Sequence, residues 1–522
     1  MNKKEIVLFL SILILAVLVR LYLITGIDMQ SDEGVWGLYA KHISELKDFI
    51  IFGSPAHNGA LDPYISAVFF KLFGIGLLQL RLGPFLVYLV FLISLYILIK
   101  KIYSQRIACF SLIFAAIAPY PFIGWSFFCL GGYIWTQLLI CCGLLILFHF
   151  IKHDFKISKK KWLGFGVLIG FSLYTQYIIL VFWVVTAILF FVSYKRKILN
   201  FMIIPGVIIG LIPVFIYHLL NSTDKLFALM LKGKPVESSP GFLHNLWLYV
   251  SHHLPEMLGF KLDDPVNLFP LYLTAIISIF YVCTFIYYAY LACLSIKKYF
   301  HIKDKSNVIL IQIVIFIYAV VHSFVYIRSN FGSELVIRYL ITLFIPISIA
   351  VGLFMERLWK LKPAIAIITF SFIFGFNAYG YMITKTIPQK FMSTGASFPM
   401  DSIAKISKFC EEKKISHIYT DFHIAYKFTF YNKEKKIACC AIGPNRSDYF
   451  YPNYKNMVMA DSNAAYVIYN TDKAVIKYFF ESEMKRLGIT CSVEEMKHVN
   501  IYYNFSEHFS INDLNLGKIN ES

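Results

Sequence analysis

The chain has 522 residues, of which 58% are hydrophobic, 18% are aromatic and only 15% are charged. Soluble globular domains carry about 25% charged residues, so this composition excludes an ordinary soluble protein and indicates a membrane protein. The net charge is +18, but the sequence has no basic run interleaved with aromatic residues. We therefore expect no nucleic-acid partner and attribute the excess of Lys and Arg to membrane topology.

The first apolar segment covers about residues 5–26 and is long enough to cross a bilayer as a helix. No small-residue cleavage site follows it, so we interpret it as a retained span and not as a signal peptide. Glycines spaced four apart, Gly166/Gly170 and Gly206/Gly210, predict close helix packing further along the chain. Eleven spans are predicted in total, at about 5–26, 79–99, 107–122, 132–151, 162–175, 177–194, 200–219, 268–296, 307–327, 335–355 and 363–383.

The connections between these spans differ in charge. With a cytoplasmic N-terminus, the short inner connections carry about twice as many Lys and Arg residues as the longer outer ones. The positive-inside rule therefore predicts a multi-pass membrane protein with its N-terminus in the cytoplasm. Outer loops at 27–78 and 220–267 follow from this orientation, and everything beyond 384 lies outside as well.

Residues 384–522 differ in character from the apolar segments before them. Helix-like "MDSIAKISKFCEEKK" precedes strand-like "SHIYTD", "KIACCAIG", "AAYVIYN" and "HVNIYYNF", a pattern typical of a small α/β domain. The predicted fold class is thus a multi-span α-helical membrane module at 1–383, followed by an extracytoplasmic α/β domain at 384–522. The cysteines of this domain can be free thiols or can pair in any of three ways, and they are Cys410, Cys439, Cys440 and Cys491.

Ionisable side chains are almost missing from the interiors of the predicted spans. Transporters normally carry such residues near the bilayer midplane, where they bind ions or relay protons. Here the carboxylates gather in outer segments instead, beginning with Asp28, Asp32 and Glu33 directly after the first span. This distribution favours chemistry at the outer membrane surface. A lipid-linked sugar transporter or flippase and a non-catalytic glycan-binding membrane protein stay open as alternatives.

A sugar transfer outside the cytoplasm needs a donor on a polyprenyl phosphate, because nucleotide sugars do not cross the membrane. A carboxylate has to accept the proton of the attacking hydroxyl, and cations have to stabilise the departing phosphate. Asp32 and Glu33 are the candidates for the first task. The candidates for the second task lie at the same predicted level of the membrane, and they are Arg81, Arg328, Arg338 and Lys41.

Each of these assignments has a structural alternative. Acidic residues in a first helical turn interact favourably with the helix dipole, so Asp32 and Glu33 can be simple capping residues. Arg328 and Arg338 flank a short outer loop and can pair with Glu334 or extend toward the membrane interface. The stretch "HHLPEM" at 252–257 contains residue types that bind metals, but no further run of ligands lies nearby.

Six segments resemble the GT-C membrane glycosyltransferases, the superfamily of protein O-mannosyltransferases and lipid A aminoarabinose transferases. The likeness is closest to bacterial family 39-type members, and its segments occur in the same order along most of the chain. They are "RLYLITGIDMQSDEGVWGLYAKHI" (20–43), "HNGALDPYISAVFFKLFG" (57–74), "LRLGPFL" (80–86), "GGYIWTQLLICCGLLIL" (131–147), "SELVIRYLITLFIP" (333–346) and "YTDFHIAYKFTFYNKEKKI" (419–437).

The resemblance implies an inverting transfer from a polyprenyl-phosphate-linked sugar, at the outer face of the bacterial cytoplasmic (inner) membrane. It implies that Asp32 is the catalytic base, with Glu33 in support, and that outer basic residues bind the donor phosphate. Arg338 lies in a matching segment, whereas Arg328 and Lys41 follow from topology. No cofactor is implied, and because the relatives differ in their metal requirement a divalent metal stays open. The resemblance specifies neither the sugar nor whether the acceptor is a lipid, a glycan or a protein.

One matching segment departs from the family pattern. In "HNGALDP" an acidic residue, Asp62, stands where the mannosyltransferase-like motif is neutral. Asp62 can position an acceptor or sugar hydroxyl, or it can cap the helix that it begins. His57 and Tyr133 are further candidates for positioning the acceptor or the sugar.

Overall fold

The structure is a computed structural model of the whole chain, and it describes residues 3–53, 58–194, 200–220, 241–260, 269–300, 307–333, 337–386, 398–440, 442, 451–470 and 475–508. Its contacts divide the chain into two units, each with its own interior. The membrane unit comprises 1–27, 50–62 and 81–395, and the C-terminal unit comprises 28–49, 63–80 and 396–522. Two segments near the N-terminus thus belong with the C-terminal residues and not with the spans around them.

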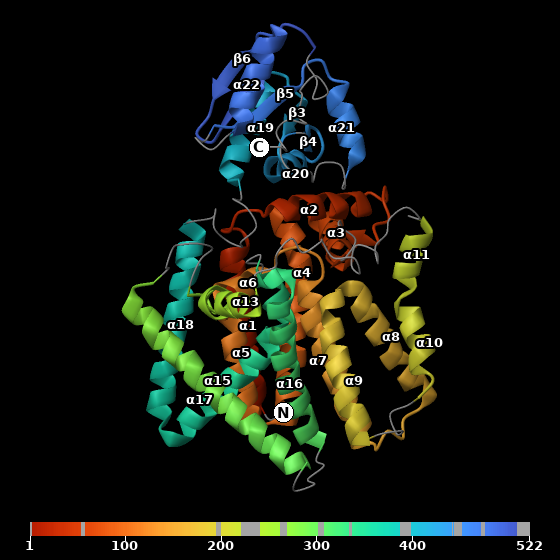
Figure 1. Cartoon of the computed structure of the whole chain (residues 1–522), viewed down its shortest axis with the longest axis vertical. Helices are drawn as coiled ribbons and strands as arrows, with labels where there is room; N and C mark the ends of the chain where they lie inside the picture. The colour runs from red at the N-terminus through yellow and green to blue at the C-terminus, as the bar shows by residue number, and fades with distance from the viewer. Residues whose placement is uncertain are drawn as a thin grey trace. The chain divides into compact units, whose positions relative to one another are not determined.

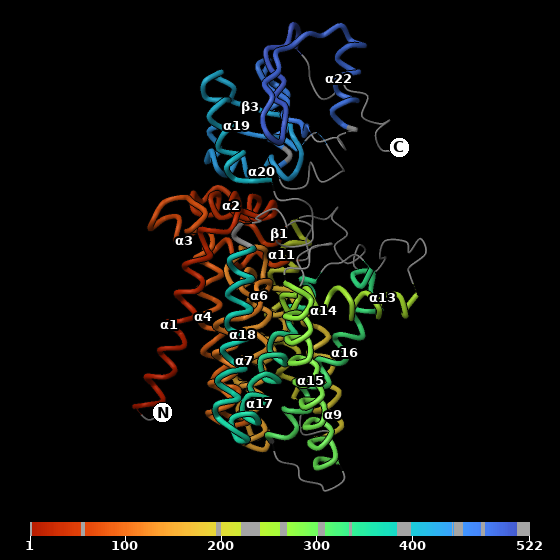
Figure 2. Tube along the Cα trace, turned by 90° about the vertical axis from the view of Figure 1, so that its left-hand side faces the viewer, coloured from red at the N-terminus to blue at the C-terminus, as the bar shows by residue number. Residues whose placement is uncertain are grey.

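The membrane unit is a bundle of helices, and long members such as α4, α7 and α18 run in roughly the same direction (Figure 2). Its helices are α1 Lys3–Ile24, α4 Leu77–Ile102, α5 Gln105–Ala116, α6 Tyr120–Trp125, α7 Tyr133–Lys152, α8 Lys159–Thr175, α9 Leu180–Tyr194, α10 Ile203–Gly210, α11 Ile212–Leu220, α13 Phe242–Leu248, α14 Leu254–Met257, α15 Leu271–Phe300, α16 Asn307–Arg328, α17 Phe344–Leu361 and α18 Pro363–Thr386. Shorter helical turns connect some of these helices, and they are Tyr177–Ile179, Tyr249–His253, Asn330–Gly332 and Ile337–Leu343. A two-stranded hairpin pairs β1 Phe52–Gly53 with β2 Asn58–Gly59.

All eleven predicted spans lie on helices, which confirms a multi-pass α-helical membrane protein. Within the described residues, eight helical segments are long and apolar enough to cross a membrane, and the bent pair α10–α11 adds a ninth. The two helices of that pair meet at 45°. The remaining two predicted spans fall on α5, with 12 residues, and on α8, with 17 residues. Both are shorter than the roughly 20 residues that a perpendicular span needs.

Helices α8 and α10 pack backbone against backbone, side by side (Figure 1). A methyl group added to Gly166 or Gly170 would overlap the carbonyl oxygens of Ile203 or Val207 on α10. Gly206 and Gly210 approach α8 in the same way. The prediction that these glycines mediate helix packing is confirmed. Close backbone approach is the usual way in which apolar helices associate where lipid supplies no hydrophobic driving force.

A buried arginine closes the end of α5. Arg20 on α1 is fully buried, and its guanidinium donates to the carbonyl oxygens of Ala115, at 3.0 Å, and of Ala116. It also donates to Ser126 Oγ at 3.1 Å and to the hydroxyl of Tyr88. The last carbonyls of a helix have no intrahelical partner, and leaving them unpaired in an apolar interior is costly. Arg20 therefore satisfies the C-terminus of α5 and ties it to α1.

The C-terminal unit contains a five-stranded mixed sheet in the order β4-β3-β5-β7-β6. Its central strands β3, β4 and β5 are parallel, whereas β7 is antiparallel to both β5 and β6. The strands are β3 His417–Thr420, β4 Ile437–Cys440, β5 Ala465–Tyr469, β6 Ser492–Glu495 and β7 Val499–Tyr503. The helices are α2 Ser31–Ser44, α19 Met400–Glu412, α20 Phe422–Tyr431, α21 Pro452–Met459 and α22 Val475–Leu487, together with most of α3 Leu61–Phe73.

The predicted α/β character of the C-terminal residues is confirmed. The four strand-like segments named from the sequence form β3, β4, β5 and β7, and the helix-like segment at 400–414 forms α19. Strand β6 was not predicted, because "SVEE" is polar and its residues are largely exposed at the edge of the sheet. Cys410 and Cys491 are free thiols.

We predict that Gly170→Ala lowers the stability of the membrane unit, because the new methyl group would meet the backbone of α10. Overpacking of this kind costs about 1–3 kcal/mol. Gly164→Ala is the matched control, since Gly164 lies on the same helix with open space beside it. Thermal unfolding of the purified protein should show a lower midpoint for Gly170→Ala only. Equal midpoints for the two variants would contradict the packing account.

Candidate functional site

The predicted acidic pair lies in the first turn of α2, and its two members differ in environment. The Glu33 side chain is fully buried, and its carboxylate accepts a hydrogen bond from the backbone N–H of Gln30 at 2.9 Å. Glu33 therefore belongs to the cap of its own helix. Asp32 is only half-buried. Of the two residues, only Asp32 is partly exposed.

Helix α2 packs along α20 in parallel, through one stripe of residues. Ser31 Oγ lies 2.9 Å from His423 Nδ1, at the start of both helices. One turn further on, a methyl group on Gly34 would lie 2.8 Å from the backbone nitrogen of Lys427, so the two backbones are in contact. Gly37 comes next and faces the ring of Phe430. The stripe positions on α2 are three or four residues apart, which places them on one helix face.

A cluster of charged groups lies at the C-terminal end of α2, where its contact with α20 ends. Lys41 is buried, and its Nζ bonds to the carboxylates of Glu45, at 3.0 Å, and of Glu434. His42 contacts Glu434 through Nε2 at 2.8 Å and Asp48 through Nδ1. Tyr454 also donates to Glu434. Lys41, which was predicted to bind the donor phosphate, is thus held in ion pairs within the C-terminal unit.

The charges in this cluster shift one another's pKa values. Burial would raise the pKa of Glu434, but hydrogen bonds from His42, Lys41 and Tyr454 lower it to about 2. Burial would likewise lower the pKa of His42, but its contacts with Glu434 and Asp48 raise it above the usual value. Both shifts favour the charged forms. The cluster therefore fastens α2 to the C-terminal residues as a network of ion pairs.

Arg81, a second candidate for the phosphate, is fully buried in the membrane unit. Its Nη1 donates to the carbonyl oxygens of Ile24, at 2.6 Å, and Ile27, at 2.7 Å. These carbonyls belong to the end of α1 and to the residues that follow it. Arg81 therefore satisfies backbone carbonyls at the C-terminal end of α1, as Arg20 does for α5. Because Arg81 lies on α4, these hydrogen bonds connect α4 to the residues that follow the first span.

Asp62 closes the start of α7. The side chain is 1% exposed, and Oδ2 accepts from the backbone N–H groups of Gly131, at 3.2 Å, and Gly132, at 3.1 Å. Oδ1 accepts from the indole N–H of Trp135 at 3.0 Å. Both glycines have positive φ, which brings their N–H groups to one carboxylate. Burial raises the pKa of Asp62 to about 6, although these hydrogen bonds lower it in part. Asp62 thus caps α7, a different helix from the one that it begins.

The remaining candidates of the membrane unit lie in separate places. Tyr133 is buried directly after the capped glycines, as the first residue of α7. Arg328 is exposed at the end of α16, with its guanidinium carbon 5.9 Å from the centre of the Phe242 ring. Arg338 is half-buried in the turn before α17, 5.4 Å from the centre of the Tyr339 ring. His57 and Glu334 lie outside the described residues.

A metal site is not assembled in the part of the chain that the structure describes. No group of three or more His, Cys, Asp or Glu side chains is placed there to hold an ion. In "HHLPEM", the two ring nitrogens of His253 already contact the Gly332 carbonyl at 3.0 Å and the Tyr326 hydroxyl at 3.3 Å.

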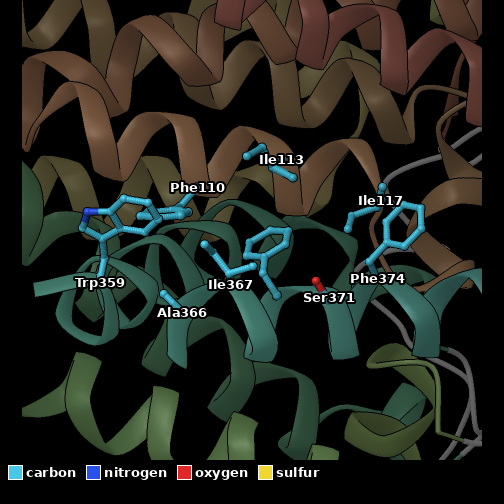
Figure 3. Close-up of a pocket in the computed structure, with 9 residues that line it drawn as sticks. Phe110, Ile113, Ile117, Trp359, Ala366, Ile367, Ser371 and Phe374 are labelled. Atoms are coloured by element: carbon cyan, nitrogen blue, oxygen red, sulfur yellow. The ribbon is translucent and has the colours of Figure 1, made fainter. Parts of the chain in front are cut away.

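The membrane unit also has an apolar groove of about 330 Å³ between α5, α17 and α18 (Figure 3). Its walls hold a single hydroxyl, that of Ser371, and no ionisable group. The groove therefore contains no carboxylate or imidazole for acid–base chemistry and no cation to bind a phosphate. Its lining residues are Phe110, Ile113, Ile117, Trp359, Ala366, Ile367, Phe370, Ser371 and Phe374.

Sequence reasoning did not single out Glu434 and His423, the two polar partners of α2. Both lie within or beside the 419–437 segment, but no pattern there marks them as facing another helix. One signal was available in "EGVWG", where two small residues three apart on an otherwise bulky helix indicate a close neighbour. It does not say which element that neighbour is.

We predict that Glu434→Gln weakens the C-terminal unit by about 3 kcal/mol, because Lys41 and His42 lose the charge that pairs them. The loss should be largest between about pH 4.5 and 6.5, where an unpaired Glu is ionised and an unpaired His is protonated. It should shrink as the pH rises through the raised pKa of His42, or falls toward the lowered pKa of Glu434. Thermal unfolding measured across this range tests the prediction.

Glu412→Gln is the control for that experiment. Glu412 pairs with Lys408, and both side chains are exposed, at 60% and 79%; exposed pairs contribute little to stability. A loss in Glu434→Gln that is no greater than in Glu412→Gln, or that does not vary with pH, would contradict the ion-pair network.

We predict that Asp62→Asn lowers stability by about 1–3 kcal/mol, because its amide NH₂ would face the N–H groups that now donate to the carboxylate. Trp135→Phe removes only one of those three donors and should cost less. Unfolding of the purified variants measures both effects. Unchanged stability in Asp62→Asn together with a higher KM for the acceptor would assign Asp62 to substrate binding instead.

Comparison with known proteins finds one family whose sequence model matches part of the chain. Residues 58–218 match the sequence model of the family described as dolichyl-phosphate-mannose-protein mannosyltransferase. This range includes Asp62, Arg81 and Tyr133 but begins after Asp32. No curated protein sequence matches the chain.

Three solved structures share the fold over most of the chain. ArnT from Cupriavidus metallidurans in the apo state is 13% identical, with a TM-score of 0.57, and the match covers 95% of this chain and 97% of that one. The same protein bound to undecaprenyl phosphate is 12% identical, with a TM-score of 0.55 and coverage of 96% and 98%. The archaeal oligosaccharyltransferase AglB from Archaeoglobus fulgidus, in complex with an inhibitory peptide and a dolichol-phosphate, is 12% identical, with a TM-score of 0.50 and coverage of 91% and 70%. The chain is therefore a multi-pass membrane protein with the fold of the GT-C glycosyltransferases, and within it residues 58–218 match the mannosyltransferase family.

Proposed function

We propose that the chain is an inverting glycosyltransferase, with a polyprenyl-phosphate-linked sugar as its donor. The observation that carries the proposal is the difference between the two acidic residues: Glu33 is fully buried and caps its own helix, whereas Asp32 is only half-buried. The mannosyltransferase match supports the reaction type. Neighbours of the same fold that bind undecaprenyl phosphate and dolichol-phosphate support the class of donor.

In the proposed reaction, the acceptor hydroxyl, Asp32 and the polyprenyl phosphate each have one role. A hydroxyl of the acceptor attacks the anomeric carbon of the donor sugar, and Asp32 accepts the hydroxyl proton as general base. The bond between that carbon and the phosphate oxygen breaks, and polyprenyl phosphate leaves with the bonding electron pair. A single base and direct displacement invert the configuration at the anomeric carbon. The acceptor is a lipid, a glycan or a protein.

The leaving phosphate needs cationic partners, and we assign it to Arg338 and Arg328. Arginine binds a phosphate through two parallel N–H donors, which suits a group whose charge grows during the reaction. Arg338 lies in one of the segments that carry the family resemblance. Lys41 and Arg81 are the weaker candidates, because their donors already bind carboxylates and carbonyl oxygens.

The proposal includes an orientation. The distribution of Lys and Arg between the connections supports a cytoplasmic N-terminus and a reaction at the outer face of a bacterial cytoplasmic membrane. Reporter fusions after residue 400 test this assignment. An active cytoplasmic reporter at that position would remove the basis for an extracytoplasmic reaction.

We predict that Asp32→Asn lowers the release of polyprenyl phosphate by about 10²–10⁴-fold, the usual contribution of a general base. Glu33→Gln is the matched control, since its amide oxygen can still accept from the Gln30 N–H, and it should stay close to wild type. The assay uses purified protein, a radiolabelled polyprenyl-phosphate sugar and membrane acceptors. Equal release by Asp32→Asn and wild type would refute the base, and movement of the sugar without bond cleavage would indicate a transporter.

A further inference from the structure

The amino-terminal turn of α2 has a polar contact with a different segment of the chain. Ser31, next to Asp32 in the sequence, is buried, and its Oγ lies 2.9 Å from His423 Nδ1 on α20. The first N–H groups of a helix have no partner in the turn before them. In α2 the side chains of Gln30 and Glu33 form a capping box within this turn, and Ser31 adds a contact with a second helix. A side chain that holds this turn also controls where its carboxylate points.

His423 itself stands on a well-anchored element. Asp421 caps α20, with its carboxylate accepting the N–H of Ile424 at 3.1 Å. The neighbouring Phe422 is buried and its ring lies 5.7 Å from the imidazole. The first turn of α20 is thus fixed by a cap and by packing. Contacts on its own helix therefore fix the position of the imidazole independently of Ser31.

The three contacts along α2 and α20 have separable effects. The charged cluster around Glu434 holds the C-terminal end of α2, and the close approach at Gly34 and Gly37 holds its middle. The contact between Ser31 and His423 holds only the turn that carries Asp32. Removing it should loosen that turn while α2 stays docked.

We propose that His423 is a positioning residue, through which the C-terminal residues orient the Asp32 carboxylate for proton transfer. The inference rests on the proposed role of Asp32 as the base. It assigns the C-terminal part of the chain an indirect part in the reaction, that of orienting the base. His423 acts through Ser31 and the helical turn, and it has no chemical step of its own.

The test compares three variants of the full chain. His423→Ala removes the contact, and His423→Asn returns an amide oxygen close to the place of Nδ1. His417→Ala is the control, since His417 belongs to the same unit but contacts Asp461 at 2.7 Å. The measurements are amide hydrogen exchange over residues 31–35, and kcat and KM for the polyprenyl-phosphate sugar.

We expect faster exchange over residues 31–35 and about a tenfold lower kcat in His423→Ala, with the donor KM nearly unchanged. His423→Asn should recover most of both, and His417→Ala should alter neither. Wild-type exchange in His423→Ala would overturn the contact, and faster exchange with an unchanged kcat would overturn the positioning role. Failure of the proposed function is distinguishable, because Asp32→Asn would then be fully active while the exchange data still report on Ser31 and His423.

Discussion

The structure of the membrane unit depends on the pairing of backbone groups at helix ends inside an apolar bundle. Each helix leaves unpaired N–H and C=O groups at its termini, and an apolar interior supplies no water to satisfy them. Three buried charged side chains supply hydrogen bonds to these backbone groups. Arg20 closes the end of α5, Arg81 the end of α1, and Asp62 the start of α7. Their charges serve the fold, since each is matched to the partial charge at a helix end.

This constraint changes the meaning of an ionisable residue in such a chain. Buried charges in membrane proteins are usually taken as signs of function. Arg81 and Asp62 qualify by that rule, and both were candidates for substrate contacts. Their hydrogen bonds to backbone groups give each a sufficient structural reason to be charged. Asp32 is only half-buried and Arg328 is exposed, so a substrate can reach them more easily than the buried Arg81 and Asp62.

Much of the fold could be predicted from the sequence, because it follows from local patterns. Hydrophobic length located the eleven helical segments, and strand-like runs located four of the five C-terminal strands. Glycine spacing indicated close helix packing at both glycine pairs, but only the structure shows that α8 and α10 pack against each other. The bend between α10 and α11 and the short length of α5 could not be predicted, because apolar composition does not report where a helix breaks.

The site could be predicted only in part, because its long-range partners have no local signature. The acidic pair was found, but composition cannot tell a capping Glu33 from an accessible Asp32. Lys41 was expected to meet a phosphate, and its actual partner, Glu434, is 393 residues away. Asp62 was expected to cap the helix that it begins or to bind substrate, yet its partners lie about 70 residues further along. Such pairings depend on the folded arrangement of distant segments.

The account's central claim is that one carboxylate, Asp32, drives a direct displacement at the anomeric carbon. The most direct test is the anomeric configuration of the transferred sugar, determined by NMR on product made from a donor of known configuration. The account predicts inversion relative to the donor. Retention would contradict it, since a single direct displacement always inverts the anomeric carbon.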